Sequence, residues 1–440
     1  MERTLYGQLL AWKDDPKRKP LLLKGARQVG KTWLLKAFGE RAFESFVYVN
    51  CDKDENVKRL FFDYDLDRIL RSLEALSGKR IVPGRTLVVL DEIQEAPKGL
   101  GSLKYFCEER PDIHVSVAGS LLGIALHEGT NYPVGKTDEL TLHPMSFGEF
   151  LRALGEDAKA GILDGGNWTE VDSLRTAYEE LLRQYFFAGG MPEAVAAYAE
   201  SRDLRRVRRI QTTLLSHYRA DISKHAPTRE VPRILKVLDS LPAQLAKENK
   251  KFVYGAMKPG GRAKEFEIAI QWLVDAGIVD RVTRVRKSAP PLSFYEDADV
   301  FKLFLLDVGL LGALARAPAG GILVGNGAFE EYGGAFAEDY VLQQIRCEDG
   351  VEAFYWTNDN STSELDFLLQ TEDRIVPVEV KSGENLRSKS LRSFIEASPN
   401  LRGVRFSLSP YRDQTWMENV PLYGVGAWIV ANRLRSFVKN

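Results

Sequence analysis

Residues 25–32, with the sequence GARQVGKT, constrain the fold of this chain more than any other stretch. They follow an apolar run at 21–23 that is typical of a buried strand, and a helix is expected to begin at Lys31. Gly25 and Gly30 let the backbone wrap so that successive N–H groups point inward, and the helix start adds its positive dipole. This pattern predicts a loop that holds nucleotide phosphates, with a glycine-rich turn that binds no ligand as the alternative.

Most residues of this loop are expected to contact the nucleotide. They are Gly25, Arg27, Gln28, Val29, Gly30, Lys31 and Thr32. Lys31 is expected to neutralise charge on the β- and γ-phosphates, and the Thr32 hydroxyl is expected to ligate Mg²⁺. The loop therefore predicts ATP and Mg²⁺ as cofactors.

A pair of carboxylates supplies the residues that hydrolysis requires. Residues 87–90, LVVL, predict a buried strand that ends in Asp91 and Glu92. Open α/β sheets bind their ligands at the carboxyl ends of the strands, so both side chains are expected near the phosphate loop. Asp91 is expected to hold Mg²⁺ through its water shell, and Glu92 to act as the general base for the attacking water. An exposed acid at a strand end is the alternative for Glu92.

A further strand at 113–118 ends in Gly119 and Ser120. This position would place the small polar side chain of Ser120 beside the γ-phosphate, where it could sense the nucleotide. Capping of the next helix explains Ser120 equally well.

Strands and helices alternate through the first third of the chain. Strands are expected at 20–24, 46–50, 86–91, 113–118 and 139–142, helices at 31–39 and 100–109, and helical stretches within 55–76. The alternation predicts an α/β fold with a doubly wound parallel sheet. Pro144 breaks the strand pattern, and the domain is expected to end at residue 150.

Length and charge set limits on the rest of the molecule. With 440 residues the chain exceeds the roughly 250–300 residues at which a single core stops growing, so at least two domains are expected. Its 60 lysines and arginines balance 61 aspartates and glutamates, so any DNA contact must come from a local basic patch. Lys302 and Asp307 interrupt the apolar stretch at 301–314 and no apolar leader is present, which predicts a cytoplasmic protein without a membrane span.

The middle of the chain is mainly helical in its periodicity. A helix at 266–277 followed by apolar and polar alternation at 278–285 suggests a winged-helix module. That helix carries several acidic and few basic side chains, so protein packing is the alternative to a DNA-reading role.

A basic cluster lies on another helix of this region. It comprises Arg202, Arg205, Arg206, Arg208 and Arg209. Such runs are usually solvated helix faces, and binding of phosphate groups is the alternative.

The last third contains a second set of residues with catalytic potential. A helix is expected at 336–341, then strands at 352–356, 364–369 and 375–381, a helix at 388–396 and a strand at 403–408. Glu379 and Lys381 are two residues apart on a strand and share one face.

A hairpin that brings Asp366 beside Glu379 would place two carboxylates on one Mg²⁺, with Glu338 completing the set and Lys381 positioning a water molecule. These residues predict a candidate nuclease site. Charged residues alternating on a half-exposed strand are the alternative, and a nuclease fold can persist without its chemistry.

These motifs together resemble the prokaryotic AAA-type ATPases that carry a C-terminal DUF4143 domain. The resemblance covers nearly all of the chain, and its specific segments are 25–32, 89–94, 119–120, 142–147, 189–193, 301–303, 307–311 and 378–382. It implies a P-loop ATPase domain, a helical and winged-helix-like region, and an α/β domain similar to restriction-endonuclease-like nucleases. The expected boundaries are 1–150, 151–295 and 296–440.

The motifs also suggest a function, and at one position this chain differs from similar proteins. The leading hypothesis is an ATPase that couples hydrolysis to binding or remodelling DNA, branched DNA included, with nuclease activity left open, and the resemblance implies a homo-oligomer. Similar proteins often have Gly-Arg before the Pro-x-Ser-Phe stretch, but this chain has Gly135 and Lys136, which weakens the assignment of an arginine finger. The alternative function is a nucleotide-gated switch in which the C-terminal fold is a scaffold, while Glu92 beside Asp91 disfavours a small-molecule kinase.

Overall fold

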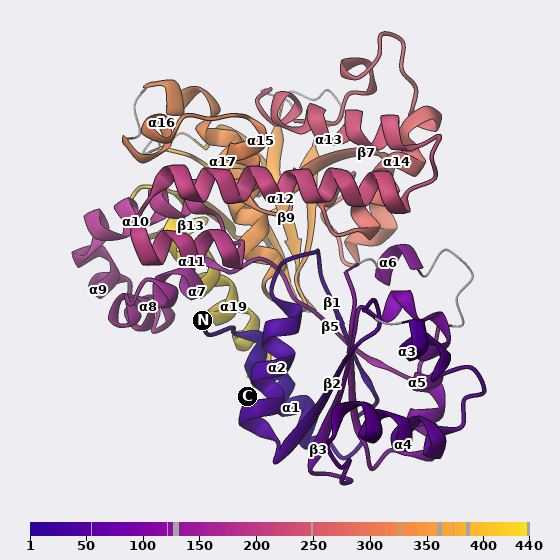
Figure 1. The fold of residues 1–440 in the computed structure, drawn as a ribbon. Coiled ribbons are helices and arrows are strands. Elements are labelled where there is room, and N and C mark those ends of the chain that lie inside the picture. Colours follow the sequence, from indigo (N-terminus) through magenta and orange to yellow (C-terminus); the bar gives the residue numbers. More distant parts are fainter. Residues whose placement is uncertain are drawn as a thin grey trace. The chain divides into compact units, whose positions relative to one another are not determined.

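The structure is a computed structural model that describes residues 1–53, 55–120, 122–125, 132–247, 250–324, 327–358, 363–372, 374–383 and 388–437. The chain divides into two compact units, which are described separately. The N-terminal unit holds residues 2–143 and the short segment 275–277, and the C-terminal unit holds residues 144–274 and the chain from 278 onward (Figure 1).

The N-terminal unit is built on a five-stranded sheet with the order β2-β3-β4-β1-β5, and every neighbouring pair is parallel. The strands are β1 (Leu21–Lys24), β2 (Ser45–Asn50), β3 (Thr86–Asp91), β4 (His114–Ala118) and β5 (Asp138–Thr141). The helices are α1 (Leu5–Asp14), α2 (Lys31–Ala42), α3 (Glu55–Arg59), α4 (Leu66–Ser77), α5 (Pro97–Glu109) and α6 (Leu122–Ala125). This sheet confirms the predicted doubly wound α/β fold.

Burial on both faces accounts for the apolar runs of these strands. Every residue of β3 is buried, as expected for a central parallel strand covered on both sides by helices. Helices α1 and α2 lie on one side of the sheet, and α4 and α5 on the other (Figure 1).

The helical region predicted at 55–76 contains two helices, α3 and α4. Tyr64 has a φ of 60°, which interrupts helical geometry between them. The Asp65 side chain then accepts a hydrogen bond from the backbone N–H of Arg68 and caps the start of α4.

The C-terminal unit combines helices with an eight-stranded mixed sheet. Its helices before the sheet are α7 (Phe147–Ala153), α8 (Asp157–Asp164), α9 (Trp168–Ser173), α10 (Arg175–Ala188), α11 (Pro192–Ser201), α12 (Leu204–His225), α13 (Val231–Leu245) and α14 (Ala263–Asp275). The sheet order is β12-β13-β11-β10-β9-β8-β6-β7. Its strands are β6 (Val279–Val285), β7 (Glu296–Leu305), β8 (Glu352–Thr357), β9 (Glu364–Gln370), β10 (Ile375–Val380), β11 (Gly403–Ser407), β12 (Arg412–Asp413) and β13 (Met417–Pro421). The remaining helices are α15 (Val308–Leu314), α16 (Ala319–Val324), α17 (Gly327–Arg346), α18 (Lys389–Ala397) and α19 (Val425–Phe437).

The helix and hairpin that suggested a winged helix are present as α14, β6 and β7, but the hairpin is part of the larger sheet. Strand β6 pairs with β7 in an antiparallel manner and with β8 in a parallel manner. A separate winged-helix module is therefore not shown, and the boundary predicted at 295/296 falls between two paired strands.

The order predicted for the last third, a helix, three strands, a helix and a strand, is found as α17, β8, β9, β10, α18 and β11. Strand β9 is antiparallel to both of its neighbours, β8 and β10, and β11 pairs with β10 in parallel. Among the described helices, none combines the length and apolar character needed to cross a membrane.

Candidate functional site

The phosphate loop lies between the end of β1 and the start of α2, as the sequence predicted. Gly25 has a φ of 141° and Gly30 a φ of 100°, conformations that L-residues rarely adopt. A Cβ atom at Gly25 would lie 2.3 Å from the Leu142 carbonyl oxygen. Glycine is therefore required at both ends of the loop by the backbone itself.

Lys31 is buried inside this loop. Its ammonium group donates hydrogen bonds to the carbonyl oxygens of Gly25 (2.9 Å) and Ala26 (2.8 Å) and to the Ser120 hydroxyl (3.2 Å). Burial lowers the pKa of Lys31 to about 8, although the charges of Glu92 and Asp91 act in the opposite direction. A phosphate group in the loop would supply a negative charge that stabilises the buried ammonium form of Lys31.

Thr32 and Asp91 form the second part of the site. The Thr32 hydroxyl donates to Asp91 Oδ2 at 2.6 Å, and the Tyr48 hydroxyl donates to the same oxygen at 2.9 Å. Hydroxyl and carboxylate oxygens are ligands that Mg²⁺ prefers, so the predicted pair fits a magnesium ion that also contacts phosphate. Tyr48 was not foreseen from the sequence, and its position in β2, beside β3, brings it to Asp91.

Glu92 follows Asp91 with a φ of 52°, and the backbone turns away from the strand at this point. The side-chain amide of Gln94 donates to Glu92 Oε2 at 2.6 Å and orients the carboxylate. Gly119 leaves room for this amide, because a Cβ atom there would lie 2.3 Å from Gln94 Oε1. The turn after β3 and the end of β4 thus position the Gln94 amide against the Glu92 carboxylate.

Ser120 meets Lys31 at the end of β4, where the sequence placed a sensor. The alternative role, capping α6, depends on residue 121, which lies outside the described residues. Arg3 was not foreseen as part of the loop, yet its guanidinium donates to the carbonyl oxygens of Val29 (2.8 Å) and His143 (2.5 Å). Lys136, at the position compared with an arginine finger, forms a 2.8 Å ion pair with Glu108.

The candidate nuclease residues lie close together in the C-terminal unit. The β9–β10 hairpin pairs Phe367 with Val378, and Asp366 Oδ2 accepts a hydrogen bond from the Val380 N–H at 2.7 Å. The Lys381 ammonium lies 2.8 Å from Glu379 Oε1. Strands β9 and β10 thus pair as predicted, and this pairing brings Asp366 to the backbone of Val380, the residue after Glu379.

Two lysines that the sequence analysis did not assign to this group neutralise its carboxylates. The side chain of Lys302, in β7, is fully buried, and its Nζ lies 2.5 Å from Glu364 and 3.7 Å from Glu338. Lys250 forms a second ion pair with Glu338. Burial works against the charge of Lys302, but Glu338, Glu364 and Asp366 together raise its pKa.

This arrangement differs from the metal site that the sequence suggested. Burial, and next the charge of Glu338, raise the pKa of Asp366 to about 7. Among the described residues, no group of three or more His, Cys, Asp or Glu side chains is placed to hold a metal ion. Lys250 and Lys302 pair with Glu338, and Lys381 pairs with Glu379, so two of the three predicted carboxylates face ammonium groups, while Asp366 accepts from the Val380 N–H.

Three segments that carried the family resemblance meet at a buried junction in the C-terminal unit. Asp307 Oδ2 accepts from the Gly190 N–H at 2.5 Å, and the Met145 N–H donates to the Gly190 carbonyl at 2.7 Å. Cβ atoms at Gly189 and Gly190 would lie 2.2 Å from Asp307 and from the Met145 carbonyl oxygen. Close packing on the Asp307 carboxylate therefore accounts for Gly189, and close packing on the Met145 backbone accounts for Gly190.

The junction predicts an unusual dependence of stability on pH. Burial raises the pKa of Asp307 from its ordinary value of 3.8 to about 6, against the effect of its hydrogen bonds. Folding therefore favours the protonated form, and this stabilisation is complete below pH 3.8 and is lost as the pH rises through about 6. The Asp307→Asn variant has no carboxyl group at this position to titrate. The difference between its free energy of unfolding and that of wild type should therefore rise by up to about 3 kcal/mol from pH 4 to pH 7.

Urea denaturation of both proteins at pH 4 and pH 7 measures this change. Asp299→Asn, a substitution at an exposed position, is the matched control. A difference between wild type and Asp307→Asn that stays constant across this pH range would contradict the prediction.

Family models match three segments of the chain. An AAA domain matches residues 17–151, a domain of unknown function (DUF8612) matches residues 179–320, and a domain of unknown function (DUF4143) matches residues 333–424. The first and last confirm the domains on which the resemblance depended. The middle match crosses the boundary predicted at 295/296.

The solved structures that resemble this chain have low sequence identity and low TM-scores. The Walker-type ATPase PABY2304 of Pyrococcus abyssi is 14% identical with a TM-score of 0.47, and the match covers 71% of this chain and 95% of that one. The ADP form of the Aeropyrum pernix ORC2 protein is 13% identical with a TM-score of 0.31, covering 73% and 91% of the two chains. No curated protein matches the chain.

Proposed function

Because the chain belongs to the AAA-type P-loop ATPases with a C-terminal DUF4143 domain, we propose that it hydrolyses ATP with Mg²⁺ and couples this reaction to binding or remodelling DNA. One observation carries the proposal: Lys31, Thr32, Asp91 and Glu92 meet at the carboxyl edge of a parallel sheet. A protein that only bound ATP would need no general base, so the position of Glu92 beside Asp91 favours hydrolysis.

Each of these residues has a distinct task in the proposed reaction. The loop N–H groups and Lys31 would bind the phosphates, and Thr32 and Asp91 would hold Mg²⁺, which supplies charge neutralisation on the phosphates when bound. Glu92, oriented by Gln94, would accept a proton from the attacking water. Ser120 contacts Lys31 and would report the presence of the terminal phosphate to β4.

The role of DNA in this proposal comes from the C-terminal unit. The order of α17, β8, β9, β10, α18 and β11 is that expected of a nuclease-like fold. Glu338 pairs with Lys250 and Lys302, and Glu379 pairs with Lys381, which favours a binding function over cleavage. The proposal includes a homo-oligomer, in which neighbouring copies would act on the same DNA.

A nucleotide-gated switch is the second candidate function. The internally paired carboxylates favour it, because a scaffold requires no open metal site. In such a switch ATP hydrolysis would change an interaction surface, and DNA would have no effect on the hydrolysis rate.

The two candidates differ in their response to DNA. We expect the ATP hydrolysis rate to rise several-fold on adding DNA, when single-stranded, duplex and four-way substrates are compared at one Mg²⁺ concentration. Gel analysis of the same reactions reports nicking, which we expect to be absent. Hydrolysis that no DNA stimulates would favour the switch, and Mg²⁺-dependent nicking that Glu379→Ala abolishes would overturn the binding role.

A further inference from the structure

A second basic site lies in the C-terminal unit, at the start of α12. A cavity of about 790 Å³ is lined by Arg205, Arg208 and Arg209 of α12 and by Arg316, which follows α15. The first three are spaced three and four residues apart, so they share one face of the helix. Among the described residues that line the cavity, none is acidic.

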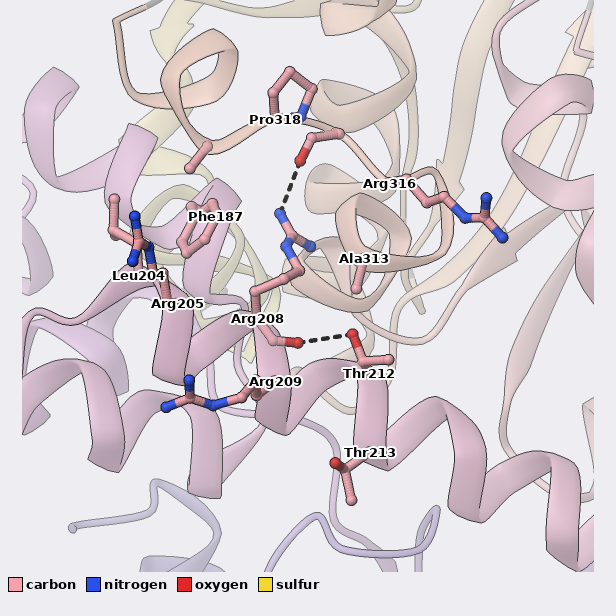
Figure 2. A pocket seen from close by; sticks show the side chains of 12 residues that line it. Phe187, Leu204, Arg205, Arg208, Arg209, Thr212, Thr213, Ala313, Arg316 and Pro318 are labelled. Atoms are coloured by element: carbon pink, nitrogen blue, oxygen red, sulfur yellow. Dashed lines mark hydrogen bonds between the residues drawn. The ribbon is translucent and has the colours of Figure 1, made fainter.

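Arg208 is the central residue of this cavity. Its side chain projects from α12 toward the segment that holds Pro318, and its Nη2 donates to the Ala317 carbonyl at 3.2 Å (Figure 2). The guanidinium carbon lies 4.6 Å from the centre of the Phe187 ring. Nη1 is buried, and no described residue accepts a hydrogen bond from it.

Arg208 also lacks a counter-ion among the described residues. Burial lowers its pKa to about 10, and no carboxylate contributes an opposing effect. A half-buried guanidinium without an anionic partner is unfavourable, and an anion in the cavity would relieve this. Asp203 does not supply it, because its carboxylate caps α12 through the N–H groups of Arg205 and Arg206.

The neighbouring arginines would strengthen binding of an anion. Arg205 and Arg209 are exposed and extend to one side of Arg208, while Arg316 extends to the other (Figure 2). No ion pair within the described part of the chain engages these three side chains. By contrast, Arg206 on the same helix lies outside the cavity and pairs with Glu200 at 2.7 Å.

We propose that this cavity binds a phosphate group of a nucleotide, separately from the phosphate loop. Planar guanidinium groups bind phosphate in a bidentate manner, and several of them converge here. The apolar walls, which include Leu204, Ala313 and Pro318, would accommodate the uncharged part of the ligand. The volume is within the roughly 300–1,000 Å³ typical of small-ligand sites.

The ligand could be a free nucleotide or a nucleotide within a strand. The chemistry that the arginines recognise is the same in both cases. Only the strand depends on the DNA-binding function proposed above, so the cavity could bind free nucleotide even if that proposal fails.

The test uses the full chain carrying Lys31→Ala, which weakens nucleotide binding at the phosphate loop. Fluorescent AMP and a fluorescent single-stranded 12-mer oligonucleotide are the two probes, and binding is measured by anisotropy. Arg208→Gln and the double change Arg205→Gln and Arg209→Gln should each weaken at least one probe by about 10- to 100-fold, as expected for loss of a charge-assisted hydrogen bond. Arg206→Gln, the matched control, should change affinity less than about twofold.

The two probes distinguish a free nucleotide from a nucleotide within a strand, and the variants test whether the arginines of the cavity bind it. Binding of AMP indicates a free nucleotide, and binding of the oligonucleotide alone, with a salt dependence that the double variant flattens, indicates a strand. Failure of both probes to bind, or equal weakening by Arg206→Gln, would overturn the proposal, as would equally strong competition by a polyglutamate peptide. If Arg208→Gln does not fold, the double variant at the exposed positions 205 and 209 still tests whether the cavity binds the probes.

Discussion

Replacing Glu92 with glutamine is expected to slow ATP hydrolysis by a factor of about 10²–10⁴ while leaving ATP affinity within a few-fold of wild type. Glu92 follows β3 with a left-handed backbone, and Gln94 fixes its Oε2 with a 2.6 Å hydrogen bond. Glutamine has nearly the same shape and can still bind a water molecule, but it cannot accept the proton. The Lys31, Thr32 and Asp91 contacts that would bind the nucleotide do not involve Glu92 directly.

Phosphate release and the binding of a fluorescent ATP analogue measure the two quantities separately. Glu95→Gln is the matched control, because Glu95 lies in the turn after β3 and is 4.0 Å from Lys58. Normal turnover in Glu92→Gln would exclude Glu92 as the general base. A loss of ATP binding as large as the loss of hydrolysis would assign Glu92 a role in binding instead.

The grouping of the phosphate loop with Asp91 and Glu92 at one edge of the sheet could be predicted from the sequence, because it depends on local order. Strand, loop and helix are contiguous at 21–42, and Asp91 and Glu92 end a strand that is apolar throughout. Parallel strands then bring these ends to one edge of the sheet. Tyr48 and Arg3 could not be predicted, because nothing in their neighbourhood indicates the distant groups they contact.

The C-terminal group shows where local reasoning fails. Glu379 and Lys381 could be paired from their spacing, and the hairpin placed Asp366 near them. Lys302 is on another strand and is brought to Glu364 only by the tertiary fold. A signal was nevertheless present, since both Lys302 and Asp307 interrupt an apolar stretch, and charged residues in such positions are rarely buried without a partner.

Replacing Lys302 with methionine is expected to lower the free energy of unfolding by about 3–5 kcal/mol. The ammonium group is completely buried and serves both Glu364 and Glu338. Methionine fills a similar volume but leaves buried carboxylates with less positive charge. Removing one member of a buried charged group costs more than the group contributes when complete, because the remaining charges have no water to solvate them.

The dependence on pH distinguishes this effect from simple loss of packing. Burial and Glu338 raise the pKa of Asp366 to about 7, and Lys302 opposes this rise, so without Lys302 acidification protonates Asp366 more readily and the deficit of Lys302→Met should shrink between pH 8 and pH 5. Adding Glu364→Gln to Lys302→Met should recover part of the lost stability at pH 8, since it removes one of those charges. Lys389→Met, at an exposed position of α18, is the control and should stay within about 0.5 kcal/mol of wild type. A deficit that does not change with pH, or a double variant less stable than Lys302→Met, would show that Lys302 acts through packing rather than by neutralising this group.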